Sequence, residues 1–252
     1  MKKWITGAAM VALAMGCMQR ADASLFVTIS DNLGTKTCDN STAAGVTACV
    51  TAGFTTSLND NNIGFSNLTV GGYTFGGNSG VNADVPGTAN FSLVSDSKLN
   101  VTHNTASTDL TITFAALGFT LPVGPNMTFS ASDTGNWALD TSANEFGAFS
   151  AWANAANTTA TSGTLAATPN CNGSAIPTTT FACQTTSGDV GFTRGAGAFS
   201  LVGQEVLHMG VGSVASFTAQ EVVSAVPEPV TFSLMGVGLL GLGLLRKRIG
   251  RS

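Results

Sequence analysis

The side chains best suited to acid–base or metal chemistry are scarce in this 252-residue chain. Its two histidines, His103 and His208, have no partner at the spacing that metal ligation requires. His103 alternates in phase with its apolar neighbours, which predicts the core side of a strand end, whereas His208 alternates out of phase, which predicts solvent exposure. Residues 31–32 and 60–64 are rich in Asp and Asn, but their spacing does not fit a calcium loop and indicates turns. No catalytic histidine, metal site or cofactor is therefore predicted.

Paired carboxylates are the other possible catalytic groups, because two acids flanking a glycosidic bond can hydrolyse it. Three glutamates, Glu145, Glu205 and Glu221, precede the last 27 residues, and none lies in an aromatic-rich strand of the kind that lines a sugar cleft. Trp137 and Trp152 flank Glu145 and are the best candidates for a sugar-stacking surface, although core packing is the favoured role. No serine-nucleophile, zinc-protease or phosphate-loop motif is present. The sequence therefore predicts a protein that is not an enzyme.

The C-terminal 27 residues have the layout of a membrane-directed tail. They contain the motif Val226-Pro227-Glu228-Pro229, an uncharged run from 230 to 245, and a basic end of Arg246, Lys247 and Arg248. A helix of the sixteen uncharged residues would be about 24 Å long, slightly short of a ~30 Å hydrocarbon core. The basic end favours the cytoplasmic side, which leaves the rest of the chain outside. A transmembrane helix is therefore predicted after the two prolines, which themselves disfavour helix.

This tail resembles the PEP-CTERM sorting signal of Gram-negative bacteria, in which a Pro-Glu-Pro motif, an apolar helix and an Arg-rich end follow one another at the C-terminus. The matching residues are Pro227, Glu228 and Pro229 with the segment behind them, about a tenth of the chain. The resemblance implies cleavage near the motif by a membrane protease called an exosortase, so that the membrane contact is transient. Members of this family are typically surface or matrix proteins associated with exopolysaccharide. The alternatives are a permanent anchor and a buried core helix, the latter disfavoured because the run is apolar on every side.

The N-terminus has the three-part layout of a secretory signal peptide. Lys2 and Lys3 precede an uncharged stretch, and Ala21-Asp22-Ala23 provides a small-x-small cleavage site after Ala23. A lipoprotein signal ending at Cys17 is an alternative, but the residues before it are not the preferred ones. The sequence thus divides into a signal peptide (1–23), an exported β-rich domain (24–225) and a sorting tail (226–252).

The central domain is poor in charge and acidic. Between residues 24 and 225 only Lys36, Lys98 and Arg194 oppose twelve acids, a net charge near −9. Such a domain repels nucleic acid and anionic membrane surfaces. A partner among nucleic acids is therefore excluded, and the composition suits a protein that works outside the cell.

Four cysteines remain in the central domain, at Cys38, Cys49, Cys171 and Cys183. An even number in an exported chain indicates disulfides, and the spacing favours two local loops, Cys38 with Cys49 and Cys171 with Cys183. The connectivity stays open at the sequence level. A zinc site is disfavoured because no Cys-x-x-Cys pair is present and an oxidising compartment opposes free thiolates.

Two-residue alternation of apolar side chains predicts strands throughout the domain. The apolar faces comprise Leu25, Val27 and Ile29; Leu99 and Val101; Leu110, Ile112 and Phe114; and Leu207, Met209 and Val211. The last strand is expected over residues 216–224, residues 151–180 are expected to form a long external loop with one short strand, and no helix is expected. Fourteen of the fifteen phenylalanines fall in the domain and are expected to fill its core. The predicted fold is all-β, a sandwich or jelly roll, flanked by the signal peptide and the transmembrane helix.

The expected function is that of an exported, non-enzymatic surface or extracellular-matrix protein, processed by an exosortase and associated with exopolysaccharide or biofilm. Before processing, the chain would be anchored in the inner membrane. Two alternatives carry the same tail: a secreted carbohydrate-active enzyme using Glu145, Glu205 or Glu221, and an anchored sugar-binding module using Trp137 or Trp152.

Overall fold

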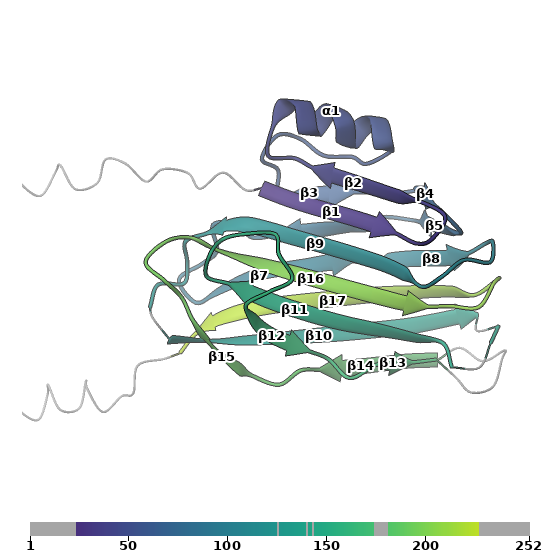
Figure 1. The fold of residues 1–252 in the computed structure, drawn as a ribbon. Helices are drawn as coiled ribbons and strands as arrows, with labels where there is room; N and C mark the ends of the chain where they lie inside the picture. Colours follow the sequence, from purple (N-terminus) through teal and green to yellow (C-terminus); the bar gives the residue numbers. More distant parts are fainter. Residues whose placement is uncertain (1–23, 125, 140, 143, 174–180, 227–252) are drawn as a thin grey trace, which may run out of the picture.

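A computed structural model describes residues 24–124, 126–139, 141–142, 144–173 and 181–226. These residues form two antiparallel sheets that pack on each other, as expected for an all-β sandwich (Figure 1). One helix lies beside the outermost strand pair of the first sheet. None of the helical segments in this part of the chain has the length and apolar character that a bilayer crossing requires.

Sheet A has seven strands, with β12-β11-β16-β9-β1-β2 as its order and β13 pairing with β11. Its strands are β1 (Ser24–Ser30), β2 (Thr35–Asp39), β9 (Leu110–Phe119), β11 (Phe146–Asn154), β12 (Thr164–Ala167), β13 (Cys171–Asn172) and β16 (Phe199–His208). The strands β12 and β13 lie in the region expected as a loop with one short strand, so that region contributes two short strands to the edge of the sheet.

Sheet B has ten strands and is built around β17. Its strands are β3 (Asn62–Gly64), β4 (Thr69–Val70), β5 (Tyr73–Gly76), β6 (Gly80–Ala83), β7 (Phe91–Ser97), β8 (Leu99–His103), β10 (Asn126–Leu139), β14 (Phe181–Thr186), β15 (Val190–Thr193) and β17 (Val214–Ala225). β17 pairs with β10 along one side and with β7 and β8 along the other. The junction between β7 and β8 is Lys98, whose φ of 48° turns the chain between the two strands.

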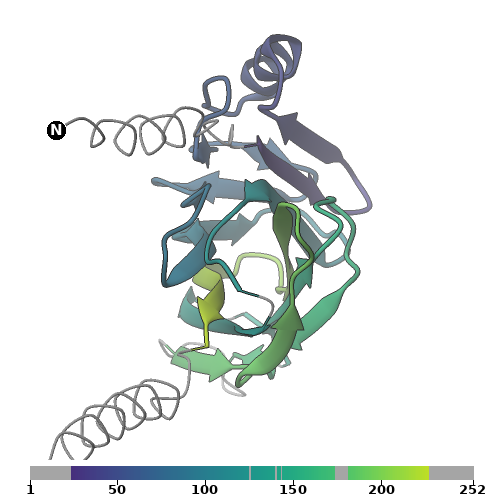
Figure 2. The same ribbon diagram turned by 90° about the vertical axis from the view of Figure 1, so that its left-hand side faces the viewer.

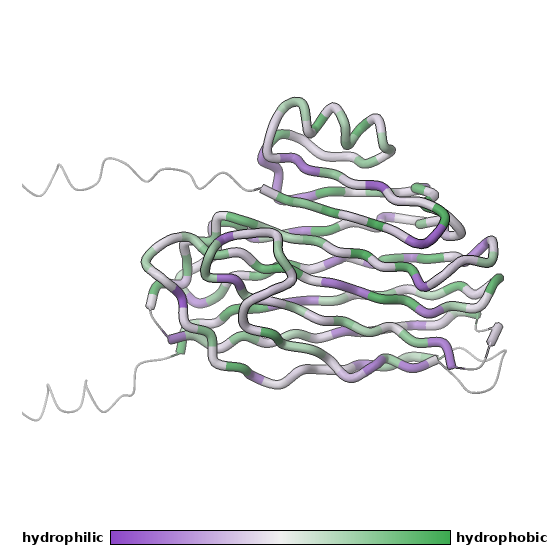
Figure 3. The backbone as a smooth tube through the Cα atoms, viewed as in Figure 1, coloured by the Kyte–Doolittle hydropathy of each residue, from purple (hydrophilic) through white to green (hydrophobic). Residues whose placement is uncertain are grey.

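The core lies between the two sheets and follows the predicted alternation. Leu25, Val27 and Ile29 are all buried, and ten of the fourteen phenylalanines of the domain are buried as well. Figure 3 shows apolar and polar residues alternating along many of the strands. One predicted core position is wrong: Val211 lies in the turn after β16 and is 51% exposed, because the strand already ends at His208.

The helix α1 (Ala43–Ala52) was not expected from the sequence. Thr42 caps its first turn by accepting a hydrogen bond from the Gly45 amide, and Gly53 ends it in the left-handed conformation with φ of 98°. Cys49 is its single buried residue, so no apolar stripe exists to mark it in the sequence. The helix is held by covalent and polar contacts instead of by an apolar face.

Both local cysteine pairs are joined in the structure. Cys38 on β2 bonds to Cys49 on α1, with 4.7 Å between their Cα atoms. Cys171 on β13 bonds to Cys183 on β14, with 5.7 Å between their Cα atoms. Lys36 adds a hydrogen bond from its ammonium to the Ala52 carbonyl, so β2 holds the C-terminal turn of the helix by two contacts.

Replacing Cys38 and Cys49 together with serine is expected to lower the free energy of unfolding by about 3 kcal/mol, because the bond closes a loop of about a dozen residues. Chemical unfolding of the oxidised double variant and the parent chain would measure this difference. The single replacement of exposed Thr47 by serine, on the same helix, is the control and should leave stability nearly unchanged. Equal stability of parent and double variant would show that α1 does not depend on this bond.

The two ends of the folded body lie at the same end of the sandwich. β1 begins and β17 ends at the left in Figure 1, and Figure 2 looks onto that end. β1 is fixed from its second residue, because the Leu25 amide donates to the Asn40 side chain at 2.8 Å and the Asn40 amide donates to the Leu25 carbonyl. At the other end, the Ala225 amide donates to the Asn90 carbonyl. Both terminal strands are therefore fully integrated into the sheets.

Candidate functional site

The two histidines occupy the positions predicted for them. His103 ends β8 and is buried, with its ring stacked on Tyr73 at 4.2 Å between centroids and its Nδ1 atom 2.8 Å from the Met209 carbonyl oxygen. His208 ends β16 on the surface and pairs with Asp109 at 2.7 Å. Neither histidine belongs to a metal-binding group, since no cluster of three or more potential ligands occurs among the residues that the structure describes.

A serine hydroxyl lies within reach of His103. Ser107 Oγ is 3.2 Å from His103 Nε2, an arrangement that a histidine base and a nucleophile share. Asp31 also interacts with Ser107; burial alone would raise the pKa of Asp31, but hydrogen bonds from Gly72, Leu33, Ser107 and Gly34 lower it overall. The ionised carboxylate would oppose negative charge developing on the Ser107 oxygen. We therefore assign this cluster a structural role, in which hydrogen bonds connect neighbouring turns. This agrees with the turn predicted at residues 31–32.

Glu145 lies just before β11 and connects two loops, at residues 141–142 and 210–213, by hydrogen bonds. It is buried, and its Oε1 atom accepts hydrogen bonds from the Gly210 amide at 2.8 Å, the Ser213 hydroxyl at 2.5 Å and the Ser142 amide at 3.1 Å. All these donors belong to the protein itself. Glu145 is 1% exposed, so a sugar on the surface cannot reach it in this structure.

Four other carboxylates converge in the core between the sheets. Asp96 on β7, Asp133 on β10 and Glu221 on β17 come from sheet B, and Glu205 on β16 comes from sheet A. Each is fully buried, with 0% of its surface exposed. One carboxylate oxygen has a hydrogen-bond partner: Asp96 Oδ1 accepts a hydrogen bond from the Ala219 amide at 2.6 Å. The other seven carboxylate oxygens accept no hydrogen bond of good geometry from the described residues. We call these four residues the acid cluster.

The acid cluster contains no compensating cation. The ion pair His208–Asp109 on the surface is the one salt bridge among the described residues. Burial raises the pKa of Asp133 to about 6, with a backbone hydrogen bond from Thr134 offsetting part of the effect. Burial also raises the pKa values of Asp96, Glu205 and Glu221 well above their ordinary range, and the charge of neighbouring acids raises them further. The cluster is therefore expected to be held largely in its protonated, uncharged form.

The acid cluster is enclosed, which excludes direct contact with a polymeric substrate in this state. Glu205 and Glu221, two of the glutamates considered for glycoside hydrolysis, thus lie together but out of reach of a sugar. Asp96 and Asp133 were missed by the sequence reasoning. A signal for them exists: each acid lies in phase with buried apolar neighbours on its strand, such as Val94 before Asp96.

The two tryptophans have different environments. Trp137 on β10 is fully buried and packs edge-on against Phe217, with ring centroids 5.2 Å apart, so the hypothesis that it stacks on sugars is wrong. Trp152 on β11 is partly exposed on the outer face of sheet A. Its neighbour in the register is Leu165 on β12, which is 49% exposed. Trp152 and Leu165 together form a small apolar surface.

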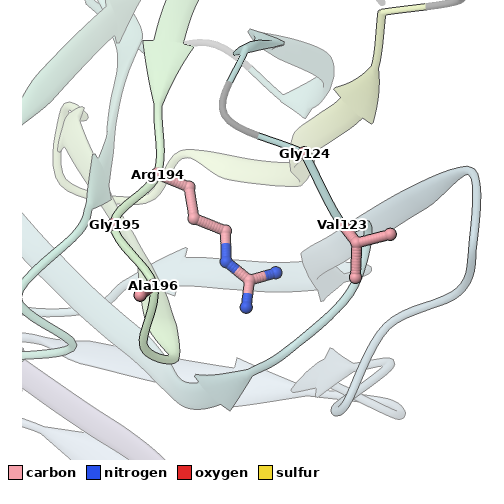
Figure 4. A pocket seen from close by; sticks show the side chains of 5 residues that line it. All are labelled: Val123, Gly124, Arg194, Gly195 and Ala196. Carbon is pink, nitrogen blue, oxygen red and sulfur yellow. The ribbon is translucent and has the colours of Figure 1, made fainter.

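A cavity of about 400 Å³ opens beside Arg194, at the end of β15. It is lined by Val123, Gly124, Arg194, Gly195 and Ala196. Figure 4 shows the Arg194 guanidinium between the two segments that carry these residues. Arg194 donates from Nη1 to the carbonyl oxygens of Thr120 and Pro122 at 2.6 and 2.7 Å. Apart from its charge, nothing in the sequence distinguishes Arg194 from its neighbours.

The predicted sorting residues mostly lie outside the described part of the chain. Val226 is described and is 46% exposed. Pro227, Glu228, Pro229 and the basic end of Arg246, Lys247 and Arg248 lie outside it, as does the predicted signal peptide 1–23. The sorting tail and the transmembrane helix therefore stay predictions.

Comparison with known proteins adds no relative: no protein-family model matches this chain, and no curated protein matches it.

Proposed function

We propose that this protein is an exported, non-enzymatic surface or extracellular-matrix protein, delivered by a C-terminal sorting tail that an exosortase removes. The tail of Pro227, Glu228 and Pro229, the apolar run and the basic end is the basis of the proposal. The membrane contact through this tail is transient. The released body associates with exopolysaccharide at the cell surface or in the biofilm matrix.

The observation that supports this proposal most is that all of the described strands lie between the two expected cleavage points. β1 begins at Ser24, the first residue after the expected signal-peptide cleavage at Ala23. β17 ends at Ala225, directly before the Val226-Pro227 bond. Removing both ends therefore leaves every described strand and every described core side chain in place. A tail built for removal has to leave a stable body behind, and the two sheets of residues 24–225 would supply that body.

The two disulfides fit the same proposal. Cys38–Cys49 and Cys171–Cys183 stabilise local loops in the way that oxidised, exported proteins commonly do. The acidic body, with its few cations, would remain soluble and would not adhere to anionic lipid or nucleic acid.

The mass of the mature protein tests the proposal directly. Protein extracted from the matrix of the producing cells is expected to begin near Ser24 and to lack residues 239–248, and deletion of the exosortase should restore the longer form. Replacing Pro227, Glu228 and Pro229 with alanine should likewise leave the tail in place. A native protein that keeps its tail in cells with an active exosortase would refute the sorting proposal.

Carbohydrate binding is the second candidate function, and one observation favours it. The partly exposed Trp152 beside Leu165 offers a ring on which a sugar could stack. The enzymatic alternative is less well supported, because Glu145 is committed to loop contacts and Glu205 and Glu221 are enclosed.

A further inference from the structure

The edge of sheet B beside β10 carries a bulge. β14 and β15 both pair with β10 in the antiparallel sense, and Figure 1 shows them one after the other along the lower edge of the molecule. Thr186 pairs with Ser132, and Val190 pairs with Phe129. Three residues lie between Thr186 and Val190, whereas two lie between their partners on β10. β14 and β15 therefore form one edge strand that is interrupted by a single extra residue.

Hydrogen bonds fix this bulge on β10. The Ser187 hydroxyl accepts a hydrogen bond from the Ala131 amide at 2.9 Å, and the Ser187 amide donates to the Ala131 carbonyl at 2.9 Å. Gly188 follows with φ of 73°, in the left-handed region that glycine adopts without strain. Bulges at sheet edges commonly redirect side chains next to a functional site. The bulge is therefore an ordered feature that can shape a binding surface.

A hollow of about 290 Å³ lies beside the bulge, on the outer face of sheet B. Ser130 pairs with Val222 and Ser132 pairs with Gln220, so these four side chains lie on one face, opposite the face that carries Ala131 and Glu221 in the core. The volume is just below the usual range of small-molecule sites, about 300–1,000 Å³, which suits a single sugar ring. We call this hollow the bulge pocket. The residues that matter below are Ser130, Ser132, Thr186, Asp189, Gln220 and Val222.

The polar side chains of the bulge pocket have their hydrogen-bonding groups free. Ser130, Ser132, Thr186, Asp189 and Gln220 make no side-chain hydrogen bond within the described ranges of the chain. Hydroxyl and amide groups can both donate and accept, which is what a sugar hydroxyl requires of its partners. Five such groups around one hollow therefore offer a set of partners for a polyhydroxylated ligand.

An apolar surface adjoins the bulge pocket on the side of β7. Leu93 pairs with Val222, and Phe91 pairs with Ser224, which places both β7 residues on the same outer face. Phe91 is diagonal to Val222, a separation of about 7–8 Å, and its side chain is 40% exposed. An exposed aromatic ring is a stacking surface for a sugar. The site therefore extends from one polar hollow to one ring, as a chain of sugars would require.

The charge of the site selects among polysaccharides. Asp189 is the one ionisable group in the pocket lining, and the one salt bridge in the described part of the chain joins His208 to Asp109 elsewhere. The body around it carries twelve acids and three cations, so it repels a polyanion such as a uronic acid polymer. An amino sugar with a free ammonium group would instead pair with Asp189 while its hydroxyls bind the neutral groups.

We infer that the bulge pocket binds one residue of an amino-sugar polysaccharide, with the ammonium group on Asp189 and the neighbouring sugar stacked on Phe91. This inference rests on the proposed association of the body with exopolysaccharide and gives that association a site and a class of ligand. Ser130, Ser132 and Gln220 would hold the hydroxyls of the bound sugar. The site lies on sheet B, whereas Trp152 lies on sheet A, so the two surfaces can be tested separately.

Titration calorimetry on the full chain, purified without protease in a detergent that has no sugar headgroup, tests the inference. A glucosamine pentamer with free amines is expected to bind about fivefold more tightly than its fully N-acetylated form, the contribution of one exposed ion pair. Asp189→Asn should remove this preference and leave the binding of the acetylated form unchanged. Asp60→Asn is the matched control, because it removes the same charge from an exposed position outside the pocket lining and should keep the preference.

A second pair of variants tests the place of binding. Ser132→Tyr should abolish the binding of both pentamers, because the ring would fill the bulge pocket from a strand position that tolerates an aromatic residue. Asn136→Tyr adds the same ring to the same face of β10, four residues away and outside the pocket lining, and should bind as the parent does. Circular dichroism would show that both variants are folded.

Three results would overturn the inference. The parent chain would release no heat with either pentamer, or Asp189→Asn and Asp60→Asn would weaken binding equally, or Ser132→Tyr, shown to be folded, would bind as tightly as Asn136→Tyr. Pentalysine that competes as well as the glucosamine pentamer would also overturn it, by assigning the pocket to cations in general. Failure of these titrations leaves the sorting proposal intact, whereas a tail that is never cut would refute sorting without affecting them.

Discussion

Raising the pH from 4 to 8 is expected to lower the free energy of unfolding of this protein, by several kcal/mol in total. The cause is the acid cluster of Asp96, Asp133, Glu205 and Glu221, which is enclosed between the sheets without a cation. Chemical unfolding followed by circular dichroism at a series of pH values would measure the dependence. Most soluble domains behave in the opposite way in the acid range, because their paired carboxylates lose stability as they become protonated.

The sign follows from the direction of the pKa shifts. Burial raises the pKa of Asp133 to about 6 and those of Asp96, Glu205 and Glu221 well above the ordinary range, so the folded state keeps protons that the unfolded state has lost. The stabilisation is full below the unfolded value near 4 and is lost as the pH rises through the folded values. Each extra proton bound by the folded state contributes a slope of roughly 1 kcal/mol per pH unit.

The acid cluster can be tested with isosteric amides. Glu205→Gln and Glu221→Gln cannot ionise, so the double variant should show a flatter pH dependence than the parent chain. Asp189→Asn, which alters an exposed acid, is the control and should keep the parent slope. A parent chain whose stability is constant or rises between pH 5 and 8 would contradict an uncharged cluster.

Trp137→Ala is expected to destabilise the protein by about 3–5 kcal/mol, the usual cost of deleting a fully buried aromatic side chain. Trp137 has 0% exposure, and its ring packs edge-on against Phe217 of the neighbouring strand β17. Urea unfolding of the variant would measure the loss. Because the ring is enclosed, any loss of glycan binding in this variant should follow the loss of folded protein.

Trp152→Ala is the informative counterpart. Its ring is partly exposed on the outer face of sheet A, so its removal should cost much less stability. If the protein binds carbohydrate through this surface, glycan pull-down should fail for Trp152→Ala while its unfolding curve stays close to that of the parent. A fall in stability as large as that of Trp137→Ala would show that Trp152 belongs to the core.

The all-β class was predictable from the alternation of apolar and polar side chains, because this pattern lies within each single strand. Leu25, Val27 and Ile29 need no knowledge of their partners to indicate a strand, and they are buried as expected. The helix α1 was not predictable in this way, since Cys49 alone among its residues is buried. A disulfide and two caps hold it, and these contacts lie outside any apolar period.

The acid cluster and the Arg194 cavity depend on long-range pairing, which explains why the sequence did not reveal them. Asp133 and Glu221 are in phase with apolar neighbours in the sequence. Only the pairing of β17 with β10 on one side and with β7 on the other brings them and Asp96 to one region. Arg194 likewise acquires its cavity from a loop more than seventy residues earlier, through the carbonyls of Thr120 and Pro122. The charge of each residue and its position in the strand alternation could be seen in the sequence. The meeting of these residues in space could not.

The position of β17 has a consequence for biosynthesis. The last strand of the body is the one that joins β10 to β7 and β8, so the larger sheet lacks its middle until residues 214–225 have emerged. An unfinished chain would therefore expose two long unpaired edges, the kind of surface on which β-rich chains aggregate. Closure of sheet B therefore has to wait for its final strand.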